Sequence, residues 1–220
     1  MIVIRAVVFD IGGVMIRLAA GWENACRAGG VEYRPFAETP AYRERLDMLE
    51  RKFGCGQITS ADYYSRLFEL VDGRYPLTDL RMLHMSVIQQ EFPGIYEVVR
   101  GLREAGYFTA CLSNTCAAHW DALDDPAQYP AIGLLNARFA SQLMGLMKPD
   151  PAIFRRFEEA TGFHPQEILY FDDMPANVAA AQQCGWQAVL ITQTEDAVPE
   201  IQAALSDCKL SFQLSSDKRN

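Results

Sequence analysis

The chain has 220 residues, 50% of them hydrophobic, which suits a globular protein with a sizeable core and a modest inserted unit. Its formal net charge of -8 argues against nucleic acid or an anionic membrane as the main partner, because phosphate groups are bound by clustered Lys and Arg. No stretch approaches the roughly 20 apolar residues of a membrane span, and the N-terminus lacks the pattern of a cleavable signal peptide. We therefore expect a cytoplasmic protein with a small-molecule partner, and the sequence leaves its oligomeric state open.

The first predicted strand covers residues 2–10 and ends in a single carboxylate. Its β-branched and aromatic residues 7–9 run directly into Asp10, and the paired Gly12 and Gly13 follow. This pattern indicates a buried parallel strand that delivers an aspartate to a sharp turn, with a positive φ expected at Gly12. Open α/β sheets bind their ligands at such strand ends.

Four helix-like segments follow the first strand, and Gly and Pro residues separate them. They cover residues 21–30, 40–53, 60–71 and 78–91. Thr59 and Asp62 form a predicted capping box at the start of the third segment. No strand comparable to the first appears before Tyr107, so the pattern predicts a helical insertion of roughly 70 residues.

Strand and helix patterns alternate regularly after Pro93. The predicted strands are residues 108–112, 138–144, 168–171 and 188–191. The predicted helices are residues 94–105, 150–161, 175–184 and 198–205. This rhythm predicts an α/β fold in which helices cover both faces of a parallel sheet.

Three carboxylates are carried to strand ends from distant parts of the chain. Asp10 follows the first strand, and Asp172 and Asp173 follow the strand at residues 168–171. Like charges gathered in one site cannot all ionise cheaply unless a cation is present. Mg²⁺ suits such a set, because this hard ion accepts carboxylates, waters and substrate oxygens. The sequence therefore predicts a Mg²⁺ cofactor at this edge of the sheet.

Four motifs of this chain resemble, in order and rough spacing, those of the haloacid dehalogenase-like hydrolase superfamily. They are Asp10 after its strand, Ser113 in "LSNT", Lys148 in "MKPDPAIF", and the Asp172–Asp173 pair in "FDDMPANVAAA". The chain is most similar to the phosphatase-like branch that includes sugar-phosphate phosphatases and the N-terminal phosphatase domain of soluble epoxide hydrolases. The resemblance implies a Rossmann-like core of residues 1–17 and 92–220, with residues 18–91 as a small α-helical cap inserted after the first strand.

The resemblance assigns the catalytic chemistry to Asp10 and Lys148. The Asp10 carboxylate would attack phosphorus to give an aspartyl-phosphate, which splits hydrolysis into two easier steps. Lys148 would neutralise the charge of the nucleophile and of the phosphoryl group. Ser113 and Asn114, at a strand tip, would donate hydrogen bonds to the phosphoryl oxygens, and Gly12 would contribute its backbone.

The same resemblance implies the metal ligands. If Asn177 is aligned with the last polar position of the fourth motif, Asp173 becomes a direct ligand of Mg²⁺, together with Asp10 and the backbone carbonyl of Gly12. Asp172 then becomes a partner of Lys148 or a support for the ligands, as does Asn177.

Gly12 is the point where this sequence departs from the family pattern. Most phosphatases of the superfamily have a second aspartate at this position, two residues after the nucleophile, and it acts as general acid and base. Its loss removes a contribution of about 10²–10⁴ in rate, unless a group such as His119 replaces it. The other interpretation of His119 and Trp120 is a His–Trp pair that faces the core.

These residues predict a Mg²⁺-dependent phosphomonoester hydrolase acting on a small phosphorylated metabolite, with a sugar 1-phosphate among the candidate substrates. Two alternatives stay open. One is a non-catalytic or regulatory binding protein on the same fold, which the glycine at position 12 motivates. The other is a 2-haloacid dehalogenase, which would use Asp10 without a metal but is not expected to carry the adjacent aspartates Asp172 and Asp173.

Overall fold

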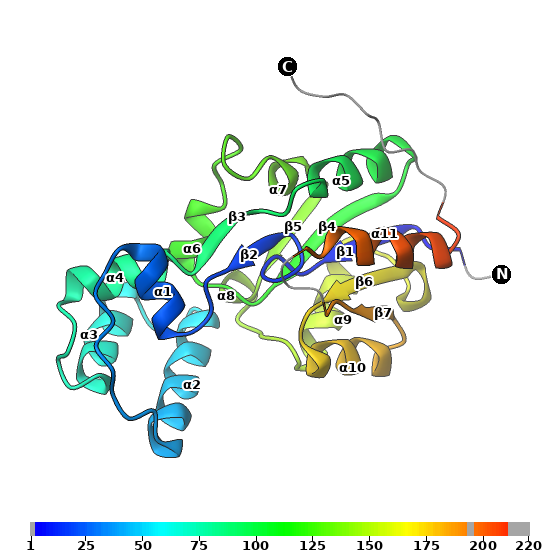
Figure 1. Ribbon diagram of the computed structural model, residues 1–220. Coiled ribbons are helices and arrows are strands. Elements are labelled where there is room, and N and C mark those ends of the chain that lie inside the picture. The colour runs from blue at the N-terminus through cyan, green and yellow to red at the C-terminus, as the bar shows by residue number, and fades with distance from the viewer. Residues whose placement is uncertain (1–2, 193–195, 211–220) are drawn as a thin grey trace.

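The computed structural model describes residues 3–192 and 196–210 and is drawn in Figure 1. Its centre is a sheet of five parallel strands in the order β5-β4-β1-β6-β7. These strands are β1 (Ala6–Phe9), β4 (Phe108–Ser113), β5 (Ala137–Ala140), β6 (Ile168–Asp172) and β7 (Gln187–Leu190). Because β1 lies in the middle, between β4 and β6, the residue that follows it reaches the centre of one sheet edge.

Helices cover both faces of this sheet, which confirms the predicted α/β fold. Alternate side chains of a strand point to opposite faces, so Val7 and Phe9 pack in one apolar cluster and Ala6 and Val8 in another. The first face is covered by α5 (Ile95–Glu104), α7 (Pro130–Leu134) and α11 (Val198–Asp207). The second face is covered by α9 (Pro151–Thr161) and α10 (Pro175–Gln183).

Four further helices form a separate bundle at one end of the sheet (Figure 1). They are α1 (Trp22–Gly29), α2 (Pro40–Gly54), α3 (Ser60–Leu70) and α4 (Leu77–Met85). The bundle has an apolar cluster of its own, built from residues such as Phe53, Tyr63 and Leu80. It joins the rest of the chain through an antiparallel pair of short strands, β2 (Ile16–Leu18) and β3 (Ile88–Glu91).

The predicted capping box is confirmed at the start of α3. The backbone N–H of Asp62 donates to Thr59 Oγ1 at 3.1 Å, and the backbone N–H of Thr59 donates to Asp62 Oδ2 at 3.3 Å. These bonds satisfy amide groups that the helix itself leaves without partners.

Two predicted elements extend too far along the chain. The helix expected over residues 78–91 ends at Met85, because residues 88–91 pair with β2 and become β3. The strand expected over residues 138–144 ends at Ala140, and α8 (Ser141–Met144) follows it. In the first case the pairing of residues 88–91 with β2, which is distant in sequence, overrides the local helical pattern.

The remaining short elements are α6 (Ala117–Ala122), which follows the tip of β4, and the 3₁₀ turn η1 (Pro165–Glu167) before β6. Both α6 and α8 begin at the carboxyl edge of the sheet, on the side of the helical bundle (Figure 1). None of the helices in the described ranges has the length and apolarity needed to cross a membrane.

Candidate active site

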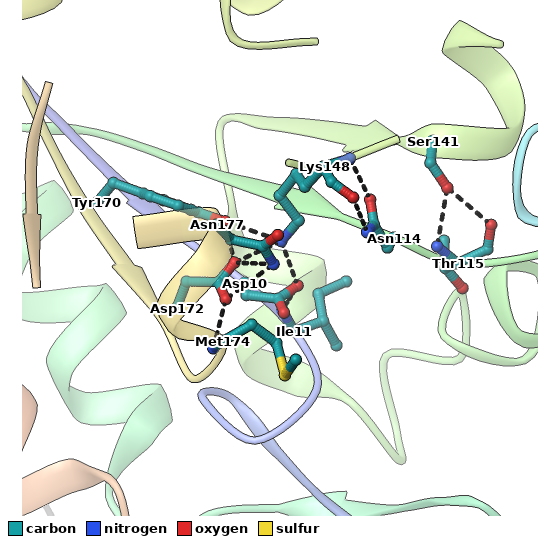
Figure 2. Close-up of polar contacts among 10 residues, drawn as sticks. All are labelled: Asp10, Ile11, Asn114, Thr115, Ser141, Lys148, Tyr170, Asp172, Met174 and Asn177. Atoms are coloured by element: carbon teal, nitrogen blue, oxygen red, sulfur yellow. Dashed lines mark hydrogen bonds and ion pairs between the residues drawn. The ribbon is translucent and has the colours of Figure 1, made fainter. Parts of the chain in front are cut away.

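Four motifs meet at the carboxyl edge of the parallel sheet. Asp10 directly follows β1, Ser113 ends β4 and Asp172 ends β6, so parallel pairing brings all three to the same side. Lys148 enters from the loop before α9, and its ammonium group lies between two of the carboxylates (Figure 2). Its Nζ atom is 3.1 Å from Asp10 Oδ1 and 2.7 Å from Asp172 Oδ2.

Lys148 is a buried cation whose charge is held by this pair of carboxylates. Burial alone disfavours the ammonium form, but Asp10 and Asp172 outweigh it and raise the pKa of Lys148 above its ordinary value. Nζ also donates to the Tyr170 hydroxyl at 2.8 Å, and that hydroxyl donates to Asp172. Burial, with Asp10 and Asp172 nearby, raises the pKa of Tyr170 well above its ordinary value, so Tyr170 stays a donor.

The Asp10 side chain is fixed by two donors. The backbone N–H of Ile11 donates to Asp10 Oδ1 at 2.7 Å, and Lys148 approaches the same oxygen. Burial raises the pKa of Asp10 to about 6; Lys148 opposes this shift, and Asp172 and Asp173 add to it. The residue is 8% exposed, so solvent does little to stabilise its charge.

Asp172 is a fully buried anchor of the site. Besides Lys148 and Tyr170, its carboxylate accepts a hydrogen bond from the backbone N–H of Met174 at 2.8 Å. The side-chain amide of Asn177 lies 3.0 and 3.1 Å from its two oxygens. These contacts hold Asn177 against Asp172 and leave the carboxylate little freedom to turn.

Asp173 completes a group of three carboxylates in which one oxygen from each of Asp10, Asp172 and Asp173 lies within 4.8 Å of the others. Asp173 is half-buried, and burial together with Asp172 raises its pKa above the ordinary value. No Lys or Arg in the described part of the chain forms an ion pair with it, whereas Asp172 is fully engaged. Hard oxygen donors with excess negative charge fit Mg²⁺, and Asp10 and Asp173 are the two carboxylates with capacity to bind it.

The positive φ after β1 falls on Gly13 rather than on Gly12, which corrects the expectation from the sequence. Gly13 has φ of 71°, and a Cβ atom there would lie 2.4 Å from Asp173 Oδ2. Gly13 therefore has two reasons to lack a side chain, the turn and the approach of Asp173. A Cβ atom on Gly12 would instead meet Leu18 Cδ1 at 2.8 Å, at the tip of a flexible side chain.

The Asn114 side chain forms two hydrogen bonds with the backbone of Lys148. Its Nδ2 atom donates to the Lys148 carbonyl at 2.9 Å, and the Lys148 N–H donates back to Asn114 Oδ1 at 2.8 Å (Figure 2). The side chain therefore ties the loop after β4 to the segment that carries Lys148. A direct bond from Asn114 to a phosphoryl oxygen stays a prediction, as does the one from Ser113, which is 4% exposed beside it.

Sequence reasoning missed Tyr170 and Ser141. Tyr170 lies two residues before Asp172 on β6, so the period of two in a strand puts both side chains on one face, and that signal was available. Ser141 directly follows β5, much as Ser113 ends β4. The strand predicted over residues 138–144 places Ser141 inside a strand instead of just after its end.

A second group of metal-ligand atoms, from His84, Cys116 and His119, lies where α4 meets α6. The two imidazole rings are stacked, with centroids 4.1 Å apart and 17° between their planes. Nitrogen lone pairs lie in the ring planes, so stacked rings do not point toward one ion. The Nε2 atom of His119 is 2.8 Å from the His84 carbonyl oxygen, and burial lowers the pKa of both residues, that of His84 to about 3. This group is therefore a packed, neutral contact between the helical bundle and the core.

Fold and site together place this chain among Rossmann-like α/β enzymes that carry their chemistry at the carboxyl edge of the sheet. A family model described as haloacid dehalogenase-like hydrolase matches residues 4–185. The chain therefore belongs to the haloacid dehalogenase-like hydrolase (HAD) family.

Two curated relatives match most of this chain. Phosphatase MT3486 of Mycobacterium tuberculosis (strain CDC 1551 / Oshkosh) is 26% identical over 222 residues, covering 89% of this chain and 92% of that protein. Acyl-CoA dehydrogenase family member 10 of Mus musculus is 26% identical over 217 residues, covering 91% of this chain. This chain spans only 19% of the mouse protein's length.

Solved structures show the same architecture. A HAD-like family hydrolase from Porphyromonas gingivalis superposes with a TM-score of 0.73 at 25% identity, covering 92% of this chain and 98% of that one. A HAD family enzyme from Bacteroides thetaiotaomicron, in complex with magnesium and inorganic phosphate, has a TM-score of 0.71 at 24% identity, covering 88% and 96%.

Proposed function

We propose that this protein is a Mg²⁺-dependent phosphomonoester hydrolase that acts through an aspartyl-phosphate at Asp10. The observation that carries the proposal is the buried Lys148 ammonium, which bridges Asp10 and Asp172 at the edge where Asp173 also lies. Phosphoryl transfer depends on positioning and charge neutralisation, and this arrangement provides both. Its substrate would be a small phosphorylated metabolite in the cytoplasm, with a sugar 1-phosphate as the first candidate.

Asp10, Asp173 and the Gly12 carbonyl are the groups that would hold Mg²⁺. The ion would supply positive charge to the phosphoryl oxygens. The magnesium and phosphate bound by the Bacteroides thetaiotaomicron enzyme support this choice of ion for the fold.

The chain's own residues would carry out the attack on phosphorus and hold the phosphoryl group. The Ile11 N–H and Lys148 both contact Asp10 Oδ1, which leaves Oδ2 as the free oxygen to attack phosphorus. As the new O–P bond forms, the ester bond breaks and the leaving oxygen takes its electron pair. Water then cleaves the aspartyl-phosphate to phosphate and regenerates Asp10. Ser113, at the tip of β4, would donate to a phosphoryl oxygen during both steps.

We also propose that residues 18–91 act as a cap over a core of residues 1–17 and 92–220. The bundle has its own apolar cluster, which Cys116 of the core also joins. His84 of α4 stacks on His119 of α6, directly beyond the loop that follows β4. The cap therefore lies over the carboxyl edge of the sheet, where it can exclude water and contact the leaving group.

Phosphate release from a panel of phosphomonoesters, with and without excess chelator, tests the proposal. We expect turnover that Mg²⁺ restores after chelation. A parallel assay of halide release from 2-haloacids addresses the dehalogenase alternative, since that reaction needs no metal. Halide release in the chelator, or tight binding of phosphate esters without any turnover, would overturn the proposal in favour of the dehalogenase or the binding protein.

The assignment of metal ligands predicts a ranking of two variants. Asp173→Ala should weaken Mg²⁺ binding at least about tenfold, because it removes a proposed ligand. Asp172→Ala should weaken it less but lower the unfolding temperature more, because Lys148 loses its closest anion. Calorimetric titration with Mg²⁺ and thermal unfolding measure the two effects. The reverse order of Mg²⁺ affinities would show that the register of the motif is shifted by one residue.

The glycine at position 12 predicts a preference for good leaving groups. Without a general acid, an anomeric hexose 1-phosphate should be hydrolysed with a higher kcat/KM than the 6-phosphate, whose alkoxide is less stable. Gly12→Asp should raise the rate on the 6-phosphate, by up to about 10²-fold. The new side chain displaces only the tip of Leu18, and the backbone there needs no left-handed conformation.

Gly12→Ala is the matched control, because it makes the same contact with Leu18 and adds no acid. It should leave the preference for the 1-phosphate unchanged. If the parent protein hydrolyses both isomers equally, and an aryl phosphate series shows no dependence on leaving-group pKa, another residue supplies the proton.

A further inference from the structure

The Ser141 hydroxyl lies where the cap, the loop after β4 and the end of β5 meet. Ser141 is fully buried and follows β5 directly. Its Oγ atom lies 2.6 Å from the carbonyl oxygen of Gly54, and 3.0 Å from both the backbone nitrogen and the carbonyl oxygen of Thr115. Figure 2 shows its two contacts with Thr115, one residue beyond Asn114.

A hydroxyl has one proton, so Ser141 can donate to only one of these two carbonyls at a time. The shorter distance makes Gly54 the acceptor in this structure, while the Thr115 N–H donates to Oγ. If Gly54 moves away, the same proton can turn to the Thr115 carbonyl. Ser141 therefore keeps a partner for its hydroxyl in both arrangements.

The Gly54 carbonyl, in contrast, depends on this contact. Gly54 is the last residue of α2, and the last four carbonyls of a helix have no partner within it. The chain beyond α2 also packs closely on α8: a Cβ atom on Gly56 would lie 2.6 Å from the Gln142 carbonyl oxygen. The end of α2 therefore packs on α8, and Ser141 donates a hydrogen bond to the Gly54 carbonyl in this contact.

We propose that Ser141 is a positioning residue that couples docking of cap helix α2 to the phosphate-binding loop at residues 113–115. The proposal rests on the phosphatase function proposed above. One hydroxyl holds the Thr115 backbone and the end of α2 together, so a loop ordered by a bound phosphoryl group favours the docked cap. Without the hydroxyl, the Gly54 carbonyl and the Thr115 N–H both lose a buried partner.

Hydrogen exchange in the whole 220-residue chain tests this coupling. The amides of Gly56 and Gln57, which bond to the carbonyls of Phe53 and Lys52, report on the end of α2. In the parent protein, inorganic phosphate with Mg²⁺ should slow their exchange. In Ser141→Ala their exchange should be faster without ligand, and the protection by phosphate should disappear. Loss of one hydrogen bond also predicts about a three- to tenfold fall in kcat/KM.

Two further variants separate coupling from a general loss of stability. Ser141→Cys keeps a weaker donor of similar size and should restore part of the protection. Thr109→Val removes another fully buried hydroxyl, bonded to Asn136 Oδ1 at 3.0 Å, from the opposite end of β4. It should lower the unfolding temperature but leave exchange at Gly56 and Gln57 unchanged.

The outcomes distinguish this proposal from the phosphatase function. Phosphate that protects these amides equally in Ser141→Ala and in the parent protein would overturn the coupling, whether or not esters are hydrolysed. Unchanged exchange in ligand-free Ser141→Ala would overturn the docking contact itself. If the parent protein neither binds phosphate nor hydrolyses esters, the phosphatase function fails, and faster ligand-free exchange in Ser141→Ala still supports the contact.

Discussion

Replacing Asp10 by Asn should abolish phosphomonoester hydrolysis and leave the fold intact. An amide of the same shape keeps an oxygen for the Ile11 N–H and Lys148, but it cannot act as the attacking carboxylate. Removal of a covalent nucleophile typically lowers kcat by about 10⁴–10⁶-fold, so phosphate release should fall by at least about 10⁴-fold. The variant should unfold at a temperature close to that of the parent protein, because Asn has nearly the shape of Asp and Lys148 keeps Asp172 as its closest anion.

Asp150→Asn is the matched control for this substitution. Asp150 is exposed, two residues after Lys148, and caps α9 by accepting a hydrogen bond from the Ala152 N–H. Asn caps a helix about as well as Asp, so activity and stability should both be retained. Phosphate release by Asp10→Asn at a rate within about 10²-fold of the parent protein would rule out the aspartyl-phosphate at Asp10.

Replacing Lys148 by Met should remove both activity and a large part of the stability. The lysine side chain is fully buried between Asp10 and Asp172, and its loss leaves two buried carboxylates without their cation. Breaking a buried ion pair in this way costs about 3–5 kcal/mol of unfolding free energy. Denaturant unfolding in chelator measures this cost directly, and saturating Mg²⁺ should recover part of it by supplying positive charge at Asp10 and Asp173.

The same substitution at an exposed lysine, Lys52→Met on α2, should change the unfolding free energy by less than about 0.5 kcal/mol. If Lys148→Met matches the parent protein in stability, the carboxylates must already be neutral without the lysine. The charge-bridging role proposed for Lys148 would then be wrong.

Much of the fold could be predicted because its signals are local. A few neighbouring residues are enough to predict three of its features: the strand before Asp10, the strand that leads to Asp172, and the capping box at Thr59. The parallel sheet then follows, since alternating strands and helices have few other ways to pack. The position of Lys148 was indicated by its motif, but its distances to Asp10 and Asp172 required the structure.

The features that escaped prediction depend on partners distant in sequence. β3 forms only because residues 88–91 meet β2, some 70 positions earlier in the chain. Ser141 forms its hydrogen bonds with Gly54 and Thr115, and no local sequence pattern connects these residues to it. The stack of His84 on His119 joins two helices in the same way, so His119 could be noticed in the sequence while its partner could not.

The β2–β3 pair makes the helical bundle, the proposed cap, a structural unit of its own. The chain enters and leaves the cap through this one pair of strands, and most of the cap's apolar cluster comes from its own four helices. Substitutions inside that cluster therefore place little strain on the sheet that holds Asp10, Lys148 and Asp172. In the function proposed above, substitutions in the cap would change the molecules that the protein accepts while the groups proposed to react stay fixed in the sheet, so new specificities would be accessible in small steps.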